Sequence, residues 1–136
     1  MKIRNRKGFT LVELLIVIII IAILAAVVVP KFSQSSKSSK EAALRSDLKL
    51  YRNAIELFRA DTGYYPLQLS DLEATSAPAQ GKDSSGTSQN ITAADWKGPY
   101  IDAVAANDPF GTAWKYSVTA GSVGKVTSAT AGYTTW

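Results

Sequence analysis

The sequence Phe9-Thr10-Leu11-Val12-Glu13 opens an apolar stretch that continues from Leu14 to Val29, sixteen residues without a polar side chain. Positions 9–29 together have 21 residues, which is long enough to cross a hydrocarbon core of roughly 30 Å as a helix. The β-branched run from Ile16 to Ile21 would suit a strand, but a single strand cannot satisfy its backbone hydrogen bonds in lipid. The stretch therefore predicts one membrane-spanning helix.

Four cations, Lys2, Arg4, Arg6 and Lys7, precede this stretch without an acid among them. Such a cluster holds its segment on the cytoplasmic side of a membrane, which sets the predicted orientation. A secretory signal peptide also starts with cations, but it has a short apolar core with a small-residue cleavage site after it, and here Glu13 interrupts the start of the apolar run. From these residues alone, three alternatives stay open: a simple anchor, a removed signal, and a segment that is cut before the apolar stretch.

The string Lys7-Gly8-Phe9-Thr10-Leu11-Val12-Glu13-Leu14-Leu15 resembles the class III signal of type IV pilins and of the pseudopilins of type II secretion. In that family a membrane aspartyl protease, the prepilin peptidase, cuts after the glycine and methylates the new amino terminus. The resemblance implies cleavage between Gly8 and Phe9, N-methyl-Phe9 as the first mature residue, and retention of the apolar helix.

Glu13 is the one charged residue of the apolar stretch, where a carboxylate costs on the order of a few kcal/mol and requires a partner or a shallow position. In one hypothesis, Glu13 lies in the first helical turn near the membrane interface, where the helix dipole favours an anion. In the other, which the resemblance implies, Glu13 pairs with the amine of Phe9, on a neighbouring subunit or its own, and sets the register of assembly. Breaking a desolvated ion pair costs more than the pair contributes, which suits a register device.

The composition excludes several classes of function. The 136 residues include no histidine and no cysteine, which removes Ser-His-Asp and Cys-His catalysis, histidine metal sites and any disulfide framework. The net charge of +4 resides in the four leader cations, because the rest of the chain has 11 Lys and Arg against 11 Asp and Glu. We therefore expect one domain plus an anchor, and predict no enzyme activity, no cofactor and no nucleic-acid partner.

Pro30 directly follows the apolar stretch. Proline has no N–H and its ring clashes with the carbonyl four residues earlier, so we expect a helix kink at Pro30, or simply the end of the membrane segment. In the family that the signal resembles, a proline near this point marks a region that can lose helical hydrogen bonds when subunits pack into a filament.

A second helical pattern follows the serine-rich segment 33–40. Apolar residues recur with gaps of 4, 3, 4 and 3 positions, the spacing of one stripe on an amphipathic helix; its members are Leu44, Leu48, Tyr51, Ile55 and Phe58. The i,i+4 pairs Glu41/Arg45 and Arg52/Glu56 are expected on the wet side. The pattern predicts a helix from Phe9 to about Asp61, ended by Gly63 and Pro66, whose second half needs a globular cover.

The rest of the chain predicts a small head domain. We expect one helical turn at 67–72 and an exposed loop at 75–92, which has Ile91 as its one large aliphatic residue. From Trp114 the pattern alternates, with Trp114, Tyr116 and Val118 on one face, and it predicts a return strand at 125–129 and an edge strand at 133–136. The apolar face of this sheet should cover the helical stripe.

Three later segments, 61–66, 96–101 and 107–111, resemble motifs of the major pseudopilin of type II secretion, so the resemblance extends over most of the chain. In the last of them, Asp108, Pro109 and Gly111 occupy the positions that a type I turn favours. The major pseudopilin of the family binds calcium in its C-terminal loops, but here no acid follows Asp108, and calcium takes six or more oxygens. We expect ordinary loop aspartates at Asp102 and Asp108 and no metal site matching that of the family.

Patterns and resemblance together predict an α+β pilin fold, in which a long N-terminal helix, half transmembrane and half amphipathic, packs on a small antiparallel sheet. The predicted divisions are a cleaved leader at 1–8, a transmembrane and assembly helix at 9–30, and a periplasmic or extracellular head at 31–136.

The predicted function is a structural subunit of a helical filament, as the major pseudopilin of a type II secretion system. A major type IV pilin, acting in adhesion, motility or DNA uptake, and a monomeric membrane-tethered binding domain are the alternatives. The absence of cysteine favours the pseudopilin, because many major type IV pilins close a C-terminal loop with a disulfide. The implied partners are further copies of the chain, the membrane, the prepilin peptidase, an inner-membrane assembly platform and minor pilins or pseudopilins. The expected location is the bacterial inner membrane, and after assembly a periplasmic or cell-surface filament.

Overall fold

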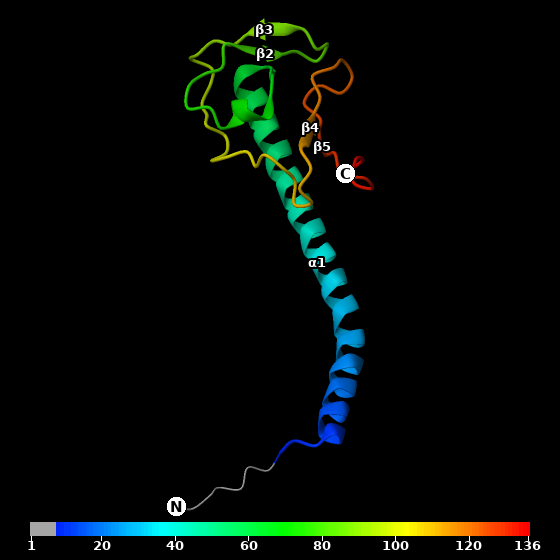
Figure 1. The fold of residues 1–136 in the computed structure, drawn as a ribbon. Helices are drawn as coiled ribbons and strands as arrows, with labels where there is room; N and C mark the ends of the chain where they lie inside the picture. Colours follow the sequence, from blue (N-terminus) through cyan, green and yellow to red (C-terminus); the bar gives the residue numbers. More distant parts are fainter. Residues whose placement is uncertain (1–7) are drawn as a thin grey trace, which may run out of the picture. The chain divides into compact units, whose positions relative to one another are not determined.

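A computed structural model describes residues 8–136, apart from the side chain of Pro30, and divides the chain into two compact units, Met1–Ser39 and Lys40–Trp136 (Figure 1). One helix, α1 (Leu11–Thr62), belongs to both units. In the first unit, the described residues from Leu11 onward are all helical. The second unit, which we call the head, holds the remaining 23 residues of α1, a short 3₁₀ helix and all the strands of the described chain.

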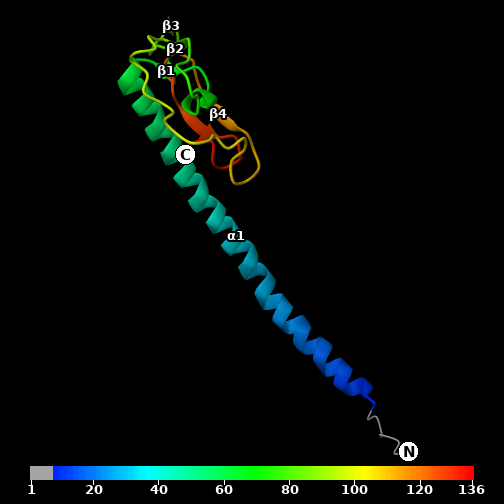
Figure 2. The same cartoon turned by 90° about the vertical axis from the view of Figure 1, so that its left-hand side faces the viewer.

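The head contains two small antiparallel sheets, which lie beside the C-terminal part of α1 in both views (Figures 1 and 2). The first sheet has the strand order β1 (Tyr65–Pro66), β2 (Gln80–Lys82), β3 (Ser88–Asn90). The second pairs β4 (Trp114–Tyr116) with β5 (Val126–Ser128), and a short 3₁₀ helix, η1 (Leu69–Leu72), follows β1. The predicted α+β fold, a long helix with small antiparallel sheets, is confirmed.

The helical stripe forms the core of the head, as the sequence predicts. Its five members are at most 3% exposed, and Ala54 joins them at 2%. The same cluster takes in residues of η1, the loop between β3 and β4, β5 and the C-terminal segment: Leu69, Leu72, Ile101, Val126 and Tyr133. The rings of Tyr51 and Trp114 meet edge to face at 5.1 Å, so the apolar side of β4 covers the stripe.

The end of α1 is also the predicted one. Gly63 adopts a φ of +80° and donates its N–H to the carbonyl of Arg59 at 2.8 Å. This left-handed residue closes the helix, since a side chain there would strain the backbone. The predicted turn at 67–72 is present as η1, and the predicted type I turn is supported by the Gly111 N–H, which donates to the Asp108 carbonyl at 2.8 Å.

The prediction of an exposed loop at 75–92 is wrong in part: most of the segment is exposed or half-buried, but β2 and β3 form a hairpin within it. The turn at 83–87 explains the hairpin: the Asp83 carboxylate accepts the N–H groups of Ser85 and Thr87, both at 2.9 Å, and Gly86 has a φ of +81°. The sequence Asp-Ser-Ser-Gly carries turn chemistry, but the strands beside it lack the large apolar residues on which the prediction of strands depends.

The predicted edge strand at 133–136 is wrong as well. The segment forms turns, and its two aromatic residues pack toward α1 instead of pairing with a strand. Tyr133 stacks on Phe110 at 4.7 Å and donates its hydroxyl to Glu41 at 2.6 Å, while the guanidinium of Arg45 lies 4.5 Å from the Trp136 ring. We call residues 130–136 the C-terminal clasp.

The clasp also changes the ion pairs that helical spacing predicts. Arg52 donates to the backbone oxygens of Val126 and Trp136, and Glu56 pairs instead with Arg59 at 3.6 Å. Glu41 accepts the hydroxyl of Tyr133, and Arg45 lies over the ring of Trp136, so both side chains contact the clasp. Helix spacing identifies which side chains are neighbours, but tertiary acceptors compete for them.

Asp108 joins the type I turn to the end of β5. Its Oδ1 accepts the N–H groups of Phe110 and Thr112 at 3.0 and 2.9 Å, and its Oδ2 accepts the hydroxyls of Ser128 and Thr130. Burial by itself raises the pKa of Asp108, but these hydrogen bonds outweigh burial and hold the pKa below its usual value. Asp108 is 4% exposed, so this carboxylate is a buried structural group.

We predict that Tyr133→Phe lowers the free energy of unfolding by about 1 kcal/mol, because it removes only the hydrogen bond to Glu41. Tyr133→Ala should cost roughly 3 kcal/mol or more, because it also removes the buried ring. Denaturant unfolding of the full chain in detergent measures both values. Tyr64→Phe is the control, since among the described residues the Tyr64 hydroxyl has no hydrogen bond. Equal effects of Tyr133→Phe and Tyr133→Ala on the free energy of unfolding would contradict the role of the clasp.

We predict that Asp108→Asn destabilises the head by about 2 kcal/mol at neutral pH, because an amide cannot accept all four hydrogen bonds. The folded pKa lies below the unfolded value of about 3.9, so the carboxylate contributes fully above that value and its contribution disappears as the pH falls through the folded pKa. Unfolding curves between neutral and acidic pH should therefore converge for the native chain and the variant. Asp95→Asn serves as the exposed control, and parallel curves would refute this role.

Candidate processing and assembly site

The N-terminal end of α1 is closed by a reciprocal cap. Thr10 precedes the helix, and its hydroxyl accepts the N–H of Glu13 at 3.2 Å. In return, Glu13 Oε2 accepts the backbone N–H and the hydroxyl of Thr10, both at 2.9 Å. This is a capping box, in which the side chains of the cap residue and of the third helical residue satisfy each other's free N–H groups.

The cap explains why α1 begins at Leu11 and not at Phe9, as the apolar pattern predicts. A cap residue takes a non-helical conformation, so Phe9 and Thr10 lie outside the helix. The spacing Thr-x-x-Glu before an apolar run is itself the sequence signal of a capping box, and the apolar pattern alone does not reveal it.

The two carboxylate oxygens of Glu13 differ in their partners. Oε2 holds both hydrogen bonds from Thr10, whereas Oε1 accepts none from the residues that the structure describes. An ionised carboxylate has about four acceptor positions, so Oε1 retains its capacity to bind a donor. Glu13 therefore stabilises its own helix and still presents one oxygen to another group.

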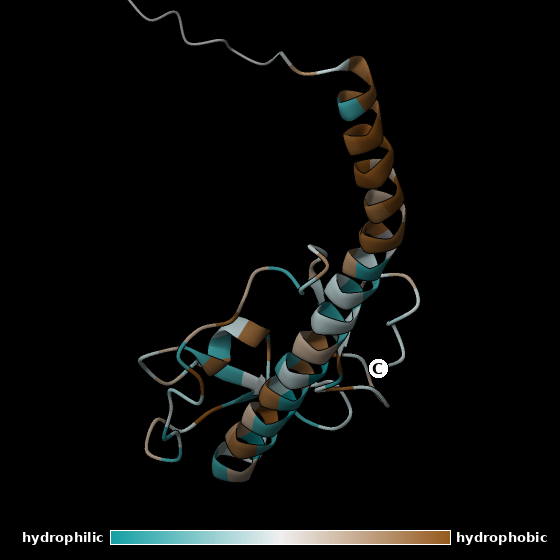
Figure 3. Cartoon of the chain, turned by 90° about the horizontal axis from the view of Figure 1, so that it is seen from below, coloured by the Kyte–Doolittle hydropathy of each residue, from teal (hydrophilic) through white to brown (hydrophobic). Residues whose placement is uncertain are grey.

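The surface around this cap is apolar. The large side chains from Leu11 to Val29 are between 44% and 87% exposed, and Figure 3 shows the beginning of α1 in brown apart from one teal band. An 18-residue window of α1 reaches a mean hydropathy of 3.4, so by length and composition the helix is a candidate membrane span. A continuous exposed apolar surface from Leu11 to Val29 requires lipid or other protein to cover it.

Three predictions concern residues that adjoin this apolar segment in the sequence: the four cations, Gly8 and Pro30. The cations Lys2, Arg4, Arg6 and Lys7 lie outside the described residues, so the membrane orientation that they predict stays a prediction. Gly8 precedes α1, and a Cβ atom built on it would meet no atom within 4 Å. α1 is helical through Pro30, and the kink predicted there stays a prediction.

Within residues 8–136, no three His, Cys, Asp or Glu residues gather in a way that would hold a metal ion. Both carboxylate oxygens of Asp108, the last acid in the sequence, accept hydrogen bonds inside the head. Asp102 is exposed and is considered with the head surface below.

Comparison with known proteins agrees with these features. Residues 3–29 match the family model of the prokaryotic N-terminal methylation motif, and residues 31–134 match that of type II secretion system protein G. A type II secretion system core protein G of Xanthomonas campestris pv. campestris is 32% identical over 111 residues, which cover 82% of this chain and 68% of the relative. No solved structure matches the chain. Because residues 31–134 match its family model, the chain belongs to the type II secretion system protein G family, and its residues 3–29 carry the N-terminal methylation motif of prepilins.

Proposed function

We propose that this chain is the major pseudopilin of a type II secretion system, a structural subunit that polymerises through its N-terminal helix. One observation carries the proposal: α1 exposes an apolar surface from Leu11 to Val29. A single carboxylate, Glu13, interrupts this surface beside the cleavage motif. The protein G family and the methylation motif support the same role. The family is one of structural pseudopilins, so the function is assembly and not catalysis.

The first step is processing by the prepilin peptidase. The proposed cleavage separates Gly8 from Phe9 and leaves the amine of Phe9, which is then methylated. Neither crowding nor a positive φ requires a glycine at position 8 in the folded chain. A requirement of the peptidase, which must hold the backbone closely, explains the glycine better than a requirement of the fold does.

The second step is pairing of the new amine with Glu13 during assembly. Phe9 lies one residue before the capping box and is 82% exposed, so its amine is accessible to a neighbouring copy. Glu13 can bind that amine through Oε1 and keep its helix cap through Oε2. In an apolar filament core, an unpaired carboxylate is costly, so the pair favours one register over the others.

The third step is packing of the apolar helices in place of lipid. Ala22, Ala25 and Ala26 give α1 small surfaces where a second helix can approach closely. Pro30 removes one backbone donor from the helix, so we propose that the helix opens there on packing. An inner-membrane assembly platform and minor pseudopilins are the proposed further partners.

Intact mass of the protein from its native membrane tests the processing step. We expect a chain that begins at Phe9 and carries one added methyl group, because the motif directs cleavage after Gly8. A chain that still begins at Met1 would favour a simple tether. A chain that begins beyond Ala26 would indicate a removed signal peptide and exclude the filament.

A set of variants separates the two roles of Glu13. Glu13→Gln keeps an oxygen for the helix cap but loses the charge, so we expect normal insertion and a loss of filaments of tenfold or more, which corresponds to about 1.4 kcal/mol. Thr10→Ala removes the hydroxyl of the cap and costs the helix about 1 kcal/mol, while the charge remains. Its filaments should therefore be less affected. Filament yield per processed subunit is the measurement, and Glu13→Gln filaments at the normal level would refute the pairing.

A further inference from the structure

The head has one exposed apolar strip that its own fold does not use. Among the described residues 40–136, Leu50 and Leu57 are the large hydrophobic side chains that stay exposed, at 51% and 56%. They are seven residues apart, two turns of α1, and thus share one side of the helix. Every member of the stripe itself is buried, so these two leucines form a second, separate apolar strip.

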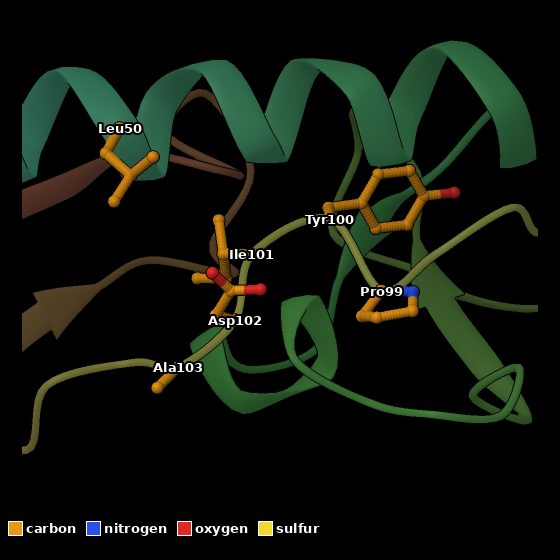
Figure 4. Close-up of a pocket in the computed structure, with 6 residues that line it drawn as sticks. All are labelled: Leu50, Pro99, Tyr100, Ile101, Asp102 and Ala103. Carbon is orange, nitrogen blue, oxygen red and sulfur yellow. The ribbon is translucent and has the colours of Figure 1, made fainter.

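A groove that carries one carboxylate, Asp102, adjoins this strip. Leu50 and the segment Pro99-Tyr100-Ile101-Asp102-Ala103 line a groove of about 330 Å³. Figure 4 shows Leu50 projecting from α1 above this segment, with the carboxylate of Asp102 beneath it. Asp102 is exposed and has no ion-pair partner among the described residues. Asp47 lies one helical turn before Leu50 and adds a second carboxyl on this side.

A second surface of the head has the opposite charge. Lys115 and Lys125 lie on one face of the β4–β5 hairpin, where Lys115 is opposite Thr127 and Ser117 is opposite Lys125. The hairpin face is hollowed by about 600 Å³ and lined further by Val118 and by hydroxyl side chains. Both lysines are exposed, and residues 109–136 contain no acid.

These two surfaces are built from different parts of the head. The groove combines α1 with residues 99–103, and the hollow lies on the β4–β5 hairpin. A helical filament requires a heterologous contact, in which one surface of a subunit meets a different surface of the next. An apolar acidic surface and a hollowed basic surface on one chain are such a complementary pair.

We infer that the basic face of the β4–β5 hairpin of one copy docks on the Leu50–Asp102 groove of the next copy in the filament. Leu50 enters the hollow beside Val118, and Asp102 faces Lys115 and Lys125. The contact rests on the proposed function, because it presupposes polymerisation, and it adds a register-setting interaction between heads. Two like charges on one hairpin face repel each other, and an acid from the neighbour relieves that repulsion.

Charge reversal tests the contact. Asp102→Lys alone, and Lys115→Asp with Lys125→Asp, should each lower the filament yield about tenfold or more, since each places like charges together. All three changes in one chain restore opposite charges and should restore most of the yield. Asp95→Lys and Lys82→Asp change the charge equally but line neither surface, so they are the controls. Processed subunit in the membrane, measured by mass, shows that each variant folds and inserts.

Cysteine cross-linking gives a second, geometric readout, because the chain has no cysteine of its own. A chain with both Asp102→Cys and Lys115→Cys should give ladders longer than a dimer on oxidation of filaments, whereas either single variant should not. Normal filament yield from the charge reversals, or loss of filaments without restoration in the triple variant, would overturn the contact. In the second case the lysines would serve an acidic partner other than a second copy. Absence of filaments from the native chain would instead refute the proposed function.

Discussion

The burial of the stripe from Leu44 to Phe58 holds the head together, because its described core is one cluster built on those side chains. Full burial of a large aliphatic or aromatic side chain contributes about 1.5–3 kcal/mol relative to exposure. Small domains have a net stability of about 5–15 kcal/mol, so no other single element of the head matches the contribution of this helix face. The strands are three residues or shorter, and short strands of this kind depend on the helix that they cover.

The parts of the fold that the sequence predicts well are those where apolar periodicity is strong. The stripe and the β4–β5 hairpin are of this kind, and both are confirmed. The helix end is confirmed as well, because Gly63 supplies the left-handed residue that closes it. The errors fall where polar chemistry decides. The hairpin of β2 and β3 depends on the Asp83 turn, and the clasp depends on Arg45 and Glu41 finding aromatic partners distant in sequence. Such contacts have no periodic signature, because tertiary structure brings their members together.

At the N-terminus, too, the sequence motif predicts the residues involved but not their polar contacts. The motif predicts Gly8, Phe9 and Glu13 as site residues, and it indicates two roles for Glu13, a dipole-favoured anion or half of an ion pair. The structure adds a third role, the cap on Thr10, which leaves Oε1 available. One carboxylate can therefore serve the isolated helix and the assembled one, because a carboxylate has more acceptor positions than its cap uses.

The head achieves rigidity without cysteines by placing polar groups where chain segments must be joined. Asp108 ties its turn to β5, and the clasp ties the last residues to α1. Both ties use charged or aromatic groups that are strong only when water is largely excluded, so they depend on the core beside them. Apolar burial therefore supplies most of the stability of the head, and the polar contacts select one arrangement of its segments. We call this order of contributions a hierarchy.

This hierarchy also bears on assembly. Apolar burial is non-directional, so an apolar helix packs against its copies in many registers at similar free energy. A filament of one defined form then requires polar groups that penalise the wrong registers, because a misplaced charge in a dry interface is costly. Among the described residues, the groups that we propose for this role are Glu13, within the apolar surface of the first unit, and Asp102, beside the exposed Leu50 of the head. Since the two groups sit in different units, each restricts the placement of its own unit, and only a register that satisfies both keeps both carboxylates paired.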